Sequence, residues 1–112
     1  MKLTNEQMVI YVEMLATLKE RGKLGYAIAR NLRKLRDAAI EFIDARTKIF
    51  DEYGKDAGDG KKTLSINVYD EKLGDIKDIE HEVDIYQVDE ETFFSGGLTS
   101  AQMEALLWMV GA

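Results

Sequence analysis

The sequence predicts an α+β protein: a helical hairpin with one long helix, a small two-stranded antiparallel β element and a C-terminal helix. Apolar residues recur three and four positions apart through the first half of the chain, which is the spacing of helices that are apolar on one side. Two short segments in the second half alternate apolar and polar residues, and the last apolar stretch returns to helical spacing. The 112 residues fit one domain, and the absence of proline allows long, uninterrupted helices.

The first arm of the hairpin is expected over about residues 5–20. Thr4 and Gln7 match a capping box, in which the threonine hydroxyl accepts a free backbone N–H and the glutamine side chain reaches back to the cap. Apolar residues then follow at helical spacing, and Gly22 is suited to close the helix because glycine readily adopts left-handed backbone angles. The hairpin as a whole would span residues 4–53.

The second arm is expected as one helix over about residues 24–53. Its apolar residues alternate between spacings of four and three, a heptad pattern with one charged member. The positions of this seam are Ile28, Leu32, Leu35, Ala39, Phe42, Arg46, Ile49 and Tyr53. At 1.5 Å per residue such a helix is about 45 Å long, which is more than the first arm can cover. We therefore expect part of it to pack on the C-terminal region or on a second copy of the chain.

The second half of the chain begins with a glycine-rich predicted loop, residues 54–62, followed by a region of strands and short helix over residues 63–92. Apolar and polar residues alternate in TLSINVYD, residues 63–70, and again in EVDIYQV, residues 82–88. This is the pattern of half-buried strands. We expect the two strands to pair antiparallel, with a short helix or turn between them.

A terminal helix is expected over residues 99–110. Thr99 and Gln102 form a second capping-box pattern, and apolar residues follow on one face. Trp108 lies beside this face and is either a core residue or part of an interface between copies, where aromatic residues concentrate. The residues of the predicted oligomer interface are Leu35, Phe42, Ile49 and Trp108.

The composition argues against several classes of protein. The chain has no cysteine, which leaves no disulfide or thiolate chemistry and fits a reducing cytoplasm. The N-terminal stretch MKLTNEQMVIYVEM does not have the pattern of a signal peptide. No apolar run approaches the roughly 20 residues of a membrane span. We therefore expect a cytoplasmic protein that does not act at a membrane.

Charge is sorted along the chain. The whole chain has a net charge of −6, but residues 19–36 are net +6 and residues 37–112 are net −11. Between Asp78 and Glu91 there are seven acids and no Lys or Arg. A positive helix face that packs on the acidic region of its own chain, or of a second copy, explains this distribution simply. The acidity of the remainder argues against duplex nucleic acid as a partner, because it would repel phosphates.

The basic stretch is the first candidate binding site. On a regular helix its arginines and lysine lie on neighbouring turns, off the apolar seam, and a tyrosine and an asparagine lie within one turn of them. Guanidinium groups bind phosphate through paired hydrogen bonds, and an aromatic ring stacks on a base. The stretch thus predicts a pocket for a phosphorylated small molecule, lined by Tyr26, Arg30, Asn31, Arg33 and Lys34. The alternative is a solvated face that pairs with nearby acids.

The acidic stretch is the second candidate site, with Asp78, Glu80, Glu82 and Asp84 as its interaction surface. Such a row of carboxylates could imitate a nucleic-acid backbone and occupy the basic groove of a host protein. The alternative is an edge strand whose charges protect it from aggregation.

No catalytic or metal site is predicted. His81 is the only histidine, and its neighbours Glu80 and Glu82 would point to the opposite face of a strand, so the three side chains do not converge. Metal sites need several ligands brought together. Without cysteine or a nucleophile motif, no general base with a partner can be named. We predict a non-enzymatic protein without a metal or cofactor.

Five segments carry a resemblance to a known family: MKLTNEQ at the start, RNLRKL, the YG pair of residues 53–54, EVDIYQV, and LTSAQMEALLWMV at the end. In this order they resemble a family of small uncharacterised proteins encoded by phages and prophages, mostly of Gram-positive bacteria. The resemblance covers nearly the whole chain. It implies a phage accessory protein in the cytoplasm of the bacterial host, and such proteins often act by binding host or defence components.

These observations lead to the function that we expect, which is counter-defence by binding. A homo-oligomer would sequester a nucleotide-type immune signal in the basic pocket. One alternative is a protein–protein inhibitor that presents the acidic stretch to a basic surface of a host or defence protein. The other is a helical assembly factor that uses the long helix as a tether.

Overall fold

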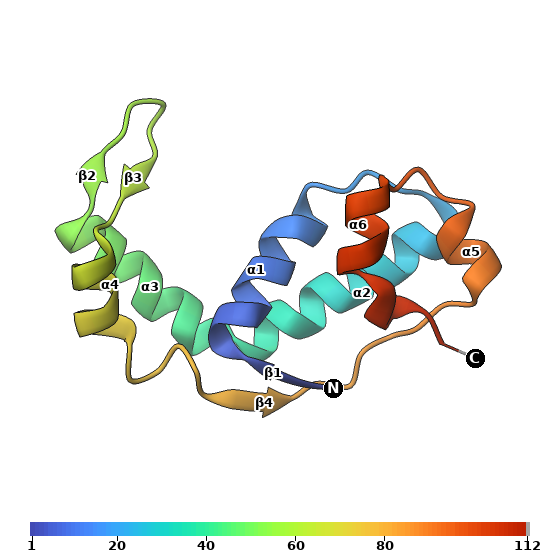
Figure 1. Cartoon of the computed structure of the whole chain (residues 1–112), viewed down its shortest axis with the longest axis horizontal. Helices are drawn as coiled ribbons and strands as arrows, with labels where there is room; N and C mark the ends of the chain where they lie inside the picture. The colour runs from blue at the N-terminus through green and yellow to red at the C-terminus, as the bar shows by residue number, and fades with distance from the viewer. Residues whose placement is uncertain (112) are drawn as a thin grey trace.

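The computed structural model describes residues 1–111 and arranges them as an α+β fold (Figure 1). The helices are α1 (Asn5–Ala16), α2 (Gly22–Ala38), α3 (Ile40–Tyr53), α4 (Ile66–Leu73), α5 (Glu90–Phe94), α6 (Ser100–Ala105) and the 3₁₀ helix η1 (Leu107–Met109). The strands are β1 (Lys2–Thr4), β2 (Lys55–Asp56), β3 (Lys62–Thr63) and β4 (Glu80–Glu82). The predicted fold class is confirmed: α1 and α2 form a hairpin, the sheets are small and antiparallel, and a helix lies near the C-terminus.

Helix α1 begins at the predicted capping box. The Thr4 hydroxyl accepts a hydrogen bond from the Gln7 N–H at 3.1 Å, and the Gln7 side chain accepts one from the Thr4 N–H at 2.9 Å. These two bonds satisfy backbone donors that the first turn of a helix leaves free. The helix ends at Ala16, which is earlier than the predicted residue 20.

Replacing this cap should destabilise the protein measurably. We expect Thr4→Ala to lower the free energy of unfolding by about 1 kcal/mol, because it removes the hydroxyl that satisfies the Gln7 N–H. The measurement is urea denaturation followed by circular dichroism. Thr47→Ala is the control, since the exposed Thr47 hydroxyl bonds only the Ile43 carbonyl of its own helix; its effect should stay within about 0.5 kcal/mol. Equal effects of the two variants would contradict the role of the cap.

The second arm of the hairpin is not one helix, because the chain bends between α2 and α3 (Figure 1). At the bend Ala39 has φ −103° and ψ 11°, outside the range of an α-helix. Hydrogen bonding continues through it: the Ala39 N–H donates to the Leu35 carbonyl at 3.1 Å, and the Ile43 N–H donates to the Ala39 carbonyl at 2.9 Å. The prediction of a single helix over residues 24–53 is therefore wrong at Ala39.

The bend lets the two helices pack on different partners. Helix α2 lies against α1, whereas α3 contacts α4. Phe42, on the first turn of α3, is buried in a small cluster with Val9 and Leu73. No proline or glycine lies at the bend, so we attribute it to these two sets of contacts, which override the local preference for a straight helix.

The β elements differ from the prediction. Residues 63–70 do not form a strand: Ser65 caps helix α4 by accepting from the Val68 N–H at 3.3 Å, and Ile66, which the alternation would bury, is 78% exposed. In the helix, Tyr69 and Leu73 are four residues apart and lie on the same face, which packs on the core. These contacts outweigh the alternating pattern of the sequence.

Strand β4 instead pairs antiparallel with β1, and Leu3 lies opposite His81. The predicted strand over residues 82–88 is also displaced, because β4 spans Glu80–Glu82 and residues 83–87 are not part of a strand. The predicted pairing of residues 63–70 with residues 82–88 is thus wrong, and Lys2–Thr4 is the partner of β4 instead. A second hairpin, β2–β3, lies within the predicted loop 54–62 and projects from the body (Figure 1). Gly58 and Gly60 allow its turn, since both have positive φ.

Two clusters of buried residues form the core. The larger one lies between α1, α2, residues 83–88 and the C-terminal segments; its members are Leu3, Met8, Leu15, Leu24, Ala27, Ile28, Leu35, Ala39, Val83, Val88, Phe93, Leu98, Leu106 and Met109. The smaller one lies where α1, α3 and α4 meet, and Ile43 packs against both clusters. Among residues 1–111, no helix is both long and apolar enough to cross a membrane.

Candidate functional site

Helix α2 presents most of the predicted ligand residues on one face. Tyr26, Arg30 and Lys34 follow one another at intervals of four, and Arg33 lies three residues after Arg30, so all four share a side of the helix. Tyr26, Arg30 and Arg33 are exposed and Lys34 is partly exposed. Asn31 differs, because it turns into the protein and is completely buried.

Tyr26 and Arg30 meet a third residue, Tyr86, from the segment that follows β4. The Arg30 guanidinium donates to the Tyr26 hydroxyl at 3.1 Å and lies 4.9 Å from the centre of the Tyr86 ring. The two tyrosine rings meet edge to face, with centroids 5.6 Å apart. The hydrogen bond to Tyr26 raises the pKa of Arg30 further, so its charge is permanent. We call Tyr26, Arg30 and Tyr86 the tyrosine–arginine site.

Asn31 fixes the position of Tyr86. Its side-chain amide donates to the Tyr86 carbonyl at 2.8 Å, and its side-chain oxygen accepts from the Tyr86 N–H at 2.7 Å. Both functions of the amide are therefore used inside the protein. Asn31, predicted as a ligand contact, instead holds the backbone that carries one ring of the site.

A hollow of about 540 Å³ lies beside the tyrosine–arginine site. Its lining residues are Gly22, Lys23, Tyr26, Tyr86, Gln87, Val88 and Asp89. Lys23 brings a positive charge to one side, and Asp89 brings a negative charge to the other. Hydrogen bonds from Thr92 lower the pKa of Asp89, which remains a carboxylate at neutral pH. The hollow thus combines two aromatic rings, one cation and one carboxylate.

Lys34 connects the basic face of α2 to the acidic stretch. Its ammonium group donates to the Asp84 carbonyl at 2.7 Å and lies 3.8 Å from the Asp84 carboxylate. This contact is the pairing of basic helix and acidic segment within one chain that charge sorting suggested. Lys34 is thereby directed toward residue 84 and away from the hollow that Tyr26 lines.

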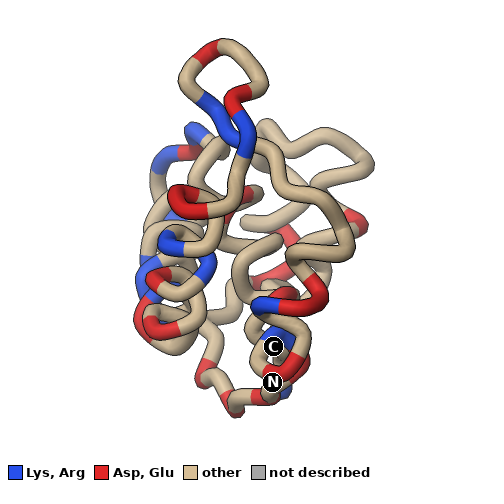
Figure 2. Tube along the Cα trace, turned by 90° about the vertical axis from the view of Figure 1, so that its left-hand side faces the viewer, with Lys and Arg blue, Asp and Glu red and all other residues tan. Residues whose placement is uncertain are grey.

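The predicted acidic surface forms an exposed row, and we call Asp78, Glu80, Glu82 and Asp84 the acidic row. Asp78 lies in the turn before β4, whereas Glu80, Glu82 and Asp84 are spaced two apart, which on an extended chain means about 7 Å and the same side. His81 and Val83 between them turn inward. Figure 2 shows acidic residues along the edge of the molecule near the N-terminus. Asp84 is paired with Lys34, and two other members also have counter-ions. Lys77 lies 3.8 Å from Asp78, and the Met1 ammonium lies 3.1 Å from Glu82.

The residues predicted for an oligomer interface are spread over several environments. Leu35 and Phe42 are buried in the core of the chain itself, so neither can face a second copy at the surface. Ile49 is half-buried against the smaller cluster. Trp108 is also half-buried and meets the Tyr11 ring edge to face, with centroids 5.3 Å apart.

Six of the seven residues that line the hollow were not among the predicted site residues: Gly22, Lys23, Tyr86, Gln87, Val88 and Asp89. Lys23 belongs to the basic stretch, and Tyr86 lies on the polar side of the alternating segment EVDIYQV. An aromatic residue on the polar side of a strand was the signal for Tyr86. Nothing in the sequence indicated that this segment lies on α2. Within residues 1–111, no three His, Asp or Glu side chains converge as metal ligands.

Comparisons with protein families, with curated proteins and with solved structures find no match for this chain. The resemblance to small phage proteins therefore stays a prediction, and the function has to be argued from the site itself.

Proposed function

We propose that the protein is a non-enzymatic binding protein whose tyrosine–arginine site holds a phosphorylated, planar small molecule of the nucleotide class. The observation that carries this proposal is the Arg30 guanidinium, held between Tyr26 and Tyr86 beside the hollow. A guanidinium group donates paired hydrogen bonds to phosphate, and tyrosine rings stack on a base.

The dimensions of the hollow support a ligand of this size. Small-molecule sites have volumes of about 300–1,000 Å³, and the hollow of about 540 Å³ falls in that range. Lys23 lines the hollow and Arg30 lies beside it on the Tyr26 and Tyr86 rings, so both supply charge for phosphate. The Asp89 carboxylate accepts hydrogen bonds from a sugar hydroxyl or an exocyclic amine. All these groups come from one chain, so the proposed site is complete without a partner subunit.

In a phage accessory protein, such a site would serve counter-defence, by sequestering a nucleotide-type immune signal in the host cytoplasm. Sequestration needs binding without turnover, and the groups of the hollow provide charge, stacking and hydrogen bonds without a nucleophile–base pair. We also propose a homo-oligomer, which would raise the number of sites per particle.

The test is a binding assay with nucleotides, including cyclic and linear oligonucleotide messengers, by isothermal titration calorimetry. Arg30→Glu should weaken binding about 10–100-fold, because a hydrogen bond to a charged group contributes about 1.5–3 kcal/mol. Arg36→Glu is the matched control, since Arg36 is an exposed arginine of the same helix without the contacts to Tyr26 and Tyr86 that Arg30 makes. It makes the same change in net charge and should leave affinity within about threefold.

An equal loss in both variants would contradict the proposal and indicate that only the overall charge of the helix matters. Native mass spectrometry of protein purified under mild conditions complements the assay. It reports both a retained ligand of a few hundred daltons and the number of chains, so it also tests the proposed oligomer.

A further inference from the structure

The segment that follows β4 has two edges with different partners. On the edge that faces α2, the Asp84 carbonyl accepts from Lys34, and both backbone groups of Tyr86 bond Asn31. On the opposite edge, Val83 exchanges two hydrogen bonds with Met1, at 2.9 and 3.0 Å. Alternate residues of an extended chain direct their N–H and C=O groups to opposite edges. Ile85 and Gln87 therefore face the same edge as Val83.

This second edge is paired at one end only. There it continues the pairing of β4 with β1 up to Met1 and Val83. Beyond Val83, the N–H and C=O groups of Ile85 and Gln87 have no hydrogen-bond partner within residues 1–111. Val88 does pair with Val110, through bonds to the Met109 carbonyl and the Gly111 N–H at 2.8 Å each, but by the same alternation it does so from the other edge. A strand edge with unpaired backbone groups is a template for a further strand.

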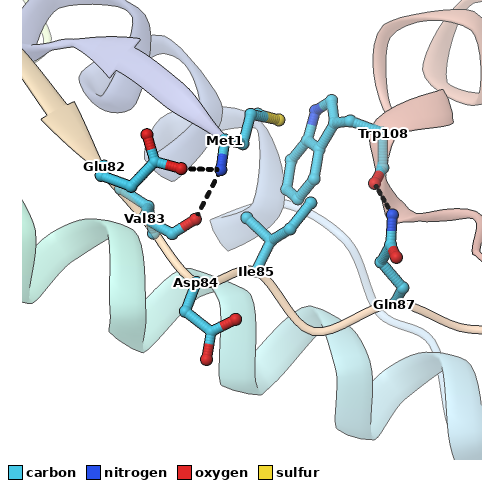
Figure 3. Close-up of a pocket in the computed structure, with 7 residues that line it drawn as sticks. All are labelled: Met1, Glu82, Val83, Asp84, Ile85, Gln87 and Trp108. Carbon is cyan, nitrogen blue, oxygen red and sulfur yellow. Dashed lines mark hydrogen bonds and ion pairs between the residues drawn. The ribbon is translucent and has the colours of Figure 1, made fainter.

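A hollow of about 580 Å³ lies along this open edge (Figure 3). It is lined by Met1, Glu82, Val83, Asp84, Ile85, Gln87 and Trp108. Figure 3 shows Met1, Ile85 and Trp108 side by side, and the Gln87 side chain bonded to the Trp108 carbonyl at 3.2 Å. The hollow is thus walled by the end of β1, the open edge and the C-terminal 3₁₀ helix.

Trp108 contributes a second unpaired group. Its indole Nε1 is buried and has no hydrogen-bond partner within residues 1–111. A buried donor left without an acceptor costs about 1–3 kcal/mol, and native proteins keep few of them. This nitrogen lies on the side of the ring away from Ile85 (Figure 3), so it is the face of the indole ring, not its N–H, that borders the open edge.

Charge decides which kind of strand fits. The hollow is flanked by Glu82 and Asp84, whose side chains are largely exposed, and the acidic row continues beyond them. A second copy that paired the same edge would bring two acidic rows together, and like charges at such distances repel. A strand with Lys or Arg at alternate positions would place its cations along the row instead.

We propose that residues 85–87 form an open strand edge that binds an extended, basic segment of a partner protein by backbone pairing, with Trp108 at its side. Strand addition of this kind draws affinity from main-chain hydrogen bonds and specificity from alternate side chains. The site uses the opposite edge of this segment from Tyr86, and Gln87 is the one residue that lines both this hollow and the one beside the tyrosine–arginine site. It gives the acidic row a role in recognising a partner protein.

The test uses Trp108, the only tryptophan, as an internal fluorescent probe. The probe peptide is acetyl-Lys-Val-Lys-Val-Lys-amide, compared with its counterpart in which Glu replaces Lys. Two further copies carry methyl groups on alternate backbone nitrogens, one copy for each register of pairing. We expect the basic peptide to change the Trp108 emission saturably, the acidic peptide to have no effect, and at least one methylated copy to bind at least tenfold more weakly.

Asp84→Asn should weaken binding of the basic peptide several-fold, because it removes one carboxylate beside the edge. Asp70→Asn is the matched control, an exposed acid on α4 that does not line the hollow, and should change nothing. The proposal is overturned if the basic peptide leaves the emission unchanged, or if both methylated copies bind as tightly as the parent. It is also overturned if emission changes with protein concentration alone and native mass spectrometry shows a dimer, since a second copy then covers the edge.

Discussion

Phe93→Ala should lower the free energy of unfolding by about 3–5 kcal/mol, the range for removing a buried phenylalanine ring. Phe93 is fully buried, with 0% of its surface exposed, and packs in the larger cluster. Removing the ring loses its burial and leaves a cavity that the surrounding helices fill only in part. Domains of this size are stable by about 5–15 kcal/mol, so the variant would lose a large share of its stability.

The neighbouring residue provides the control. Phe94 belongs to the same short helix but is 50% exposed, and its ring meets Phe93 edge to face at 5.1 Å between centroids. Phe94→Ala should cost about 1 kcal/mol, mostly through loss of this ring pair. Urea denaturation of both variants, followed by circular dichroism, measures the difference. Equal costs would mean that α5 is not anchored by Phe93 as the structure has it.

The elements that could be predicted from sequence are those fixed by local contacts. Thr4 with Gln7, and Thr99 with Gln102, start helices at the expected residues, because each capping box closes within four residues. The hairpin of α1 and α2 follows from apolar residues at helical spacing. The loop glycines also lie where expected, although Gly58 and Gly60 close a β-hairpin.

The elements that escaped prediction are set by contacts far apart in the sequence. The bend at Ala39 has no local signal, since it depends on where α1 and α4 lie. Residues 63–70 alternate like a strand, yet no neighbouring strand is available to them, and the Ser65 cap with the contacts of Leu73 favours a helix. A strand needs a partner, and the partner of β4 is a stretch of three residues, Lys2–Thr4, which is too short to recognise.

The candidate site divides in the same way. Tyr26 and Arg30 could be paired from sequence, because residues four apart on a helix are neighbours. Tyr86 could not, since 55 positions separate it from Asn31, which holds it in place. The sequence placed Asn31 on the basic face by its proximity to Arg30, but its helical position turns it toward the core. A polar residue next to a charged helix face in the sequence can thus form hydrogen bonds inside the protein and not contact a ligand.

Asn31→Ala is the variant that should connect stability to the site. The two hydrogen bonds to the Tyr86 backbone disappear, and the N–H and C=O of Tyr86 lose their partners in a part-buried place. Each such group costs about 1–3 kcal/mol, so we expect a loss of about 2–6 kcal/mol in the free energy of unfolding. The released segment carries Tyr86 away from Arg30, so affinity for a nucleotide should fall together with stability.

Asn67→Ala is the matched control, because it makes the same substitution at an exposed asparagine of another helix, α4. Its effect should stay within about 0.5 kcal/mol. Amide hydrogen exchange adds a local readout, since the Tyr86 N–H should exchange faster in Asn31→Ala while the amides of α1 keep the order of protection that they have in the parent protein. If both asparagine variants were equally mild, Lys34 and the pairing of β1 with β4 would be sufficient to hold the segment. Tyr86 would then keep its place beside Arg30 without Asn31, and affinity for a nucleotide should be unchanged in Asn31→Ala.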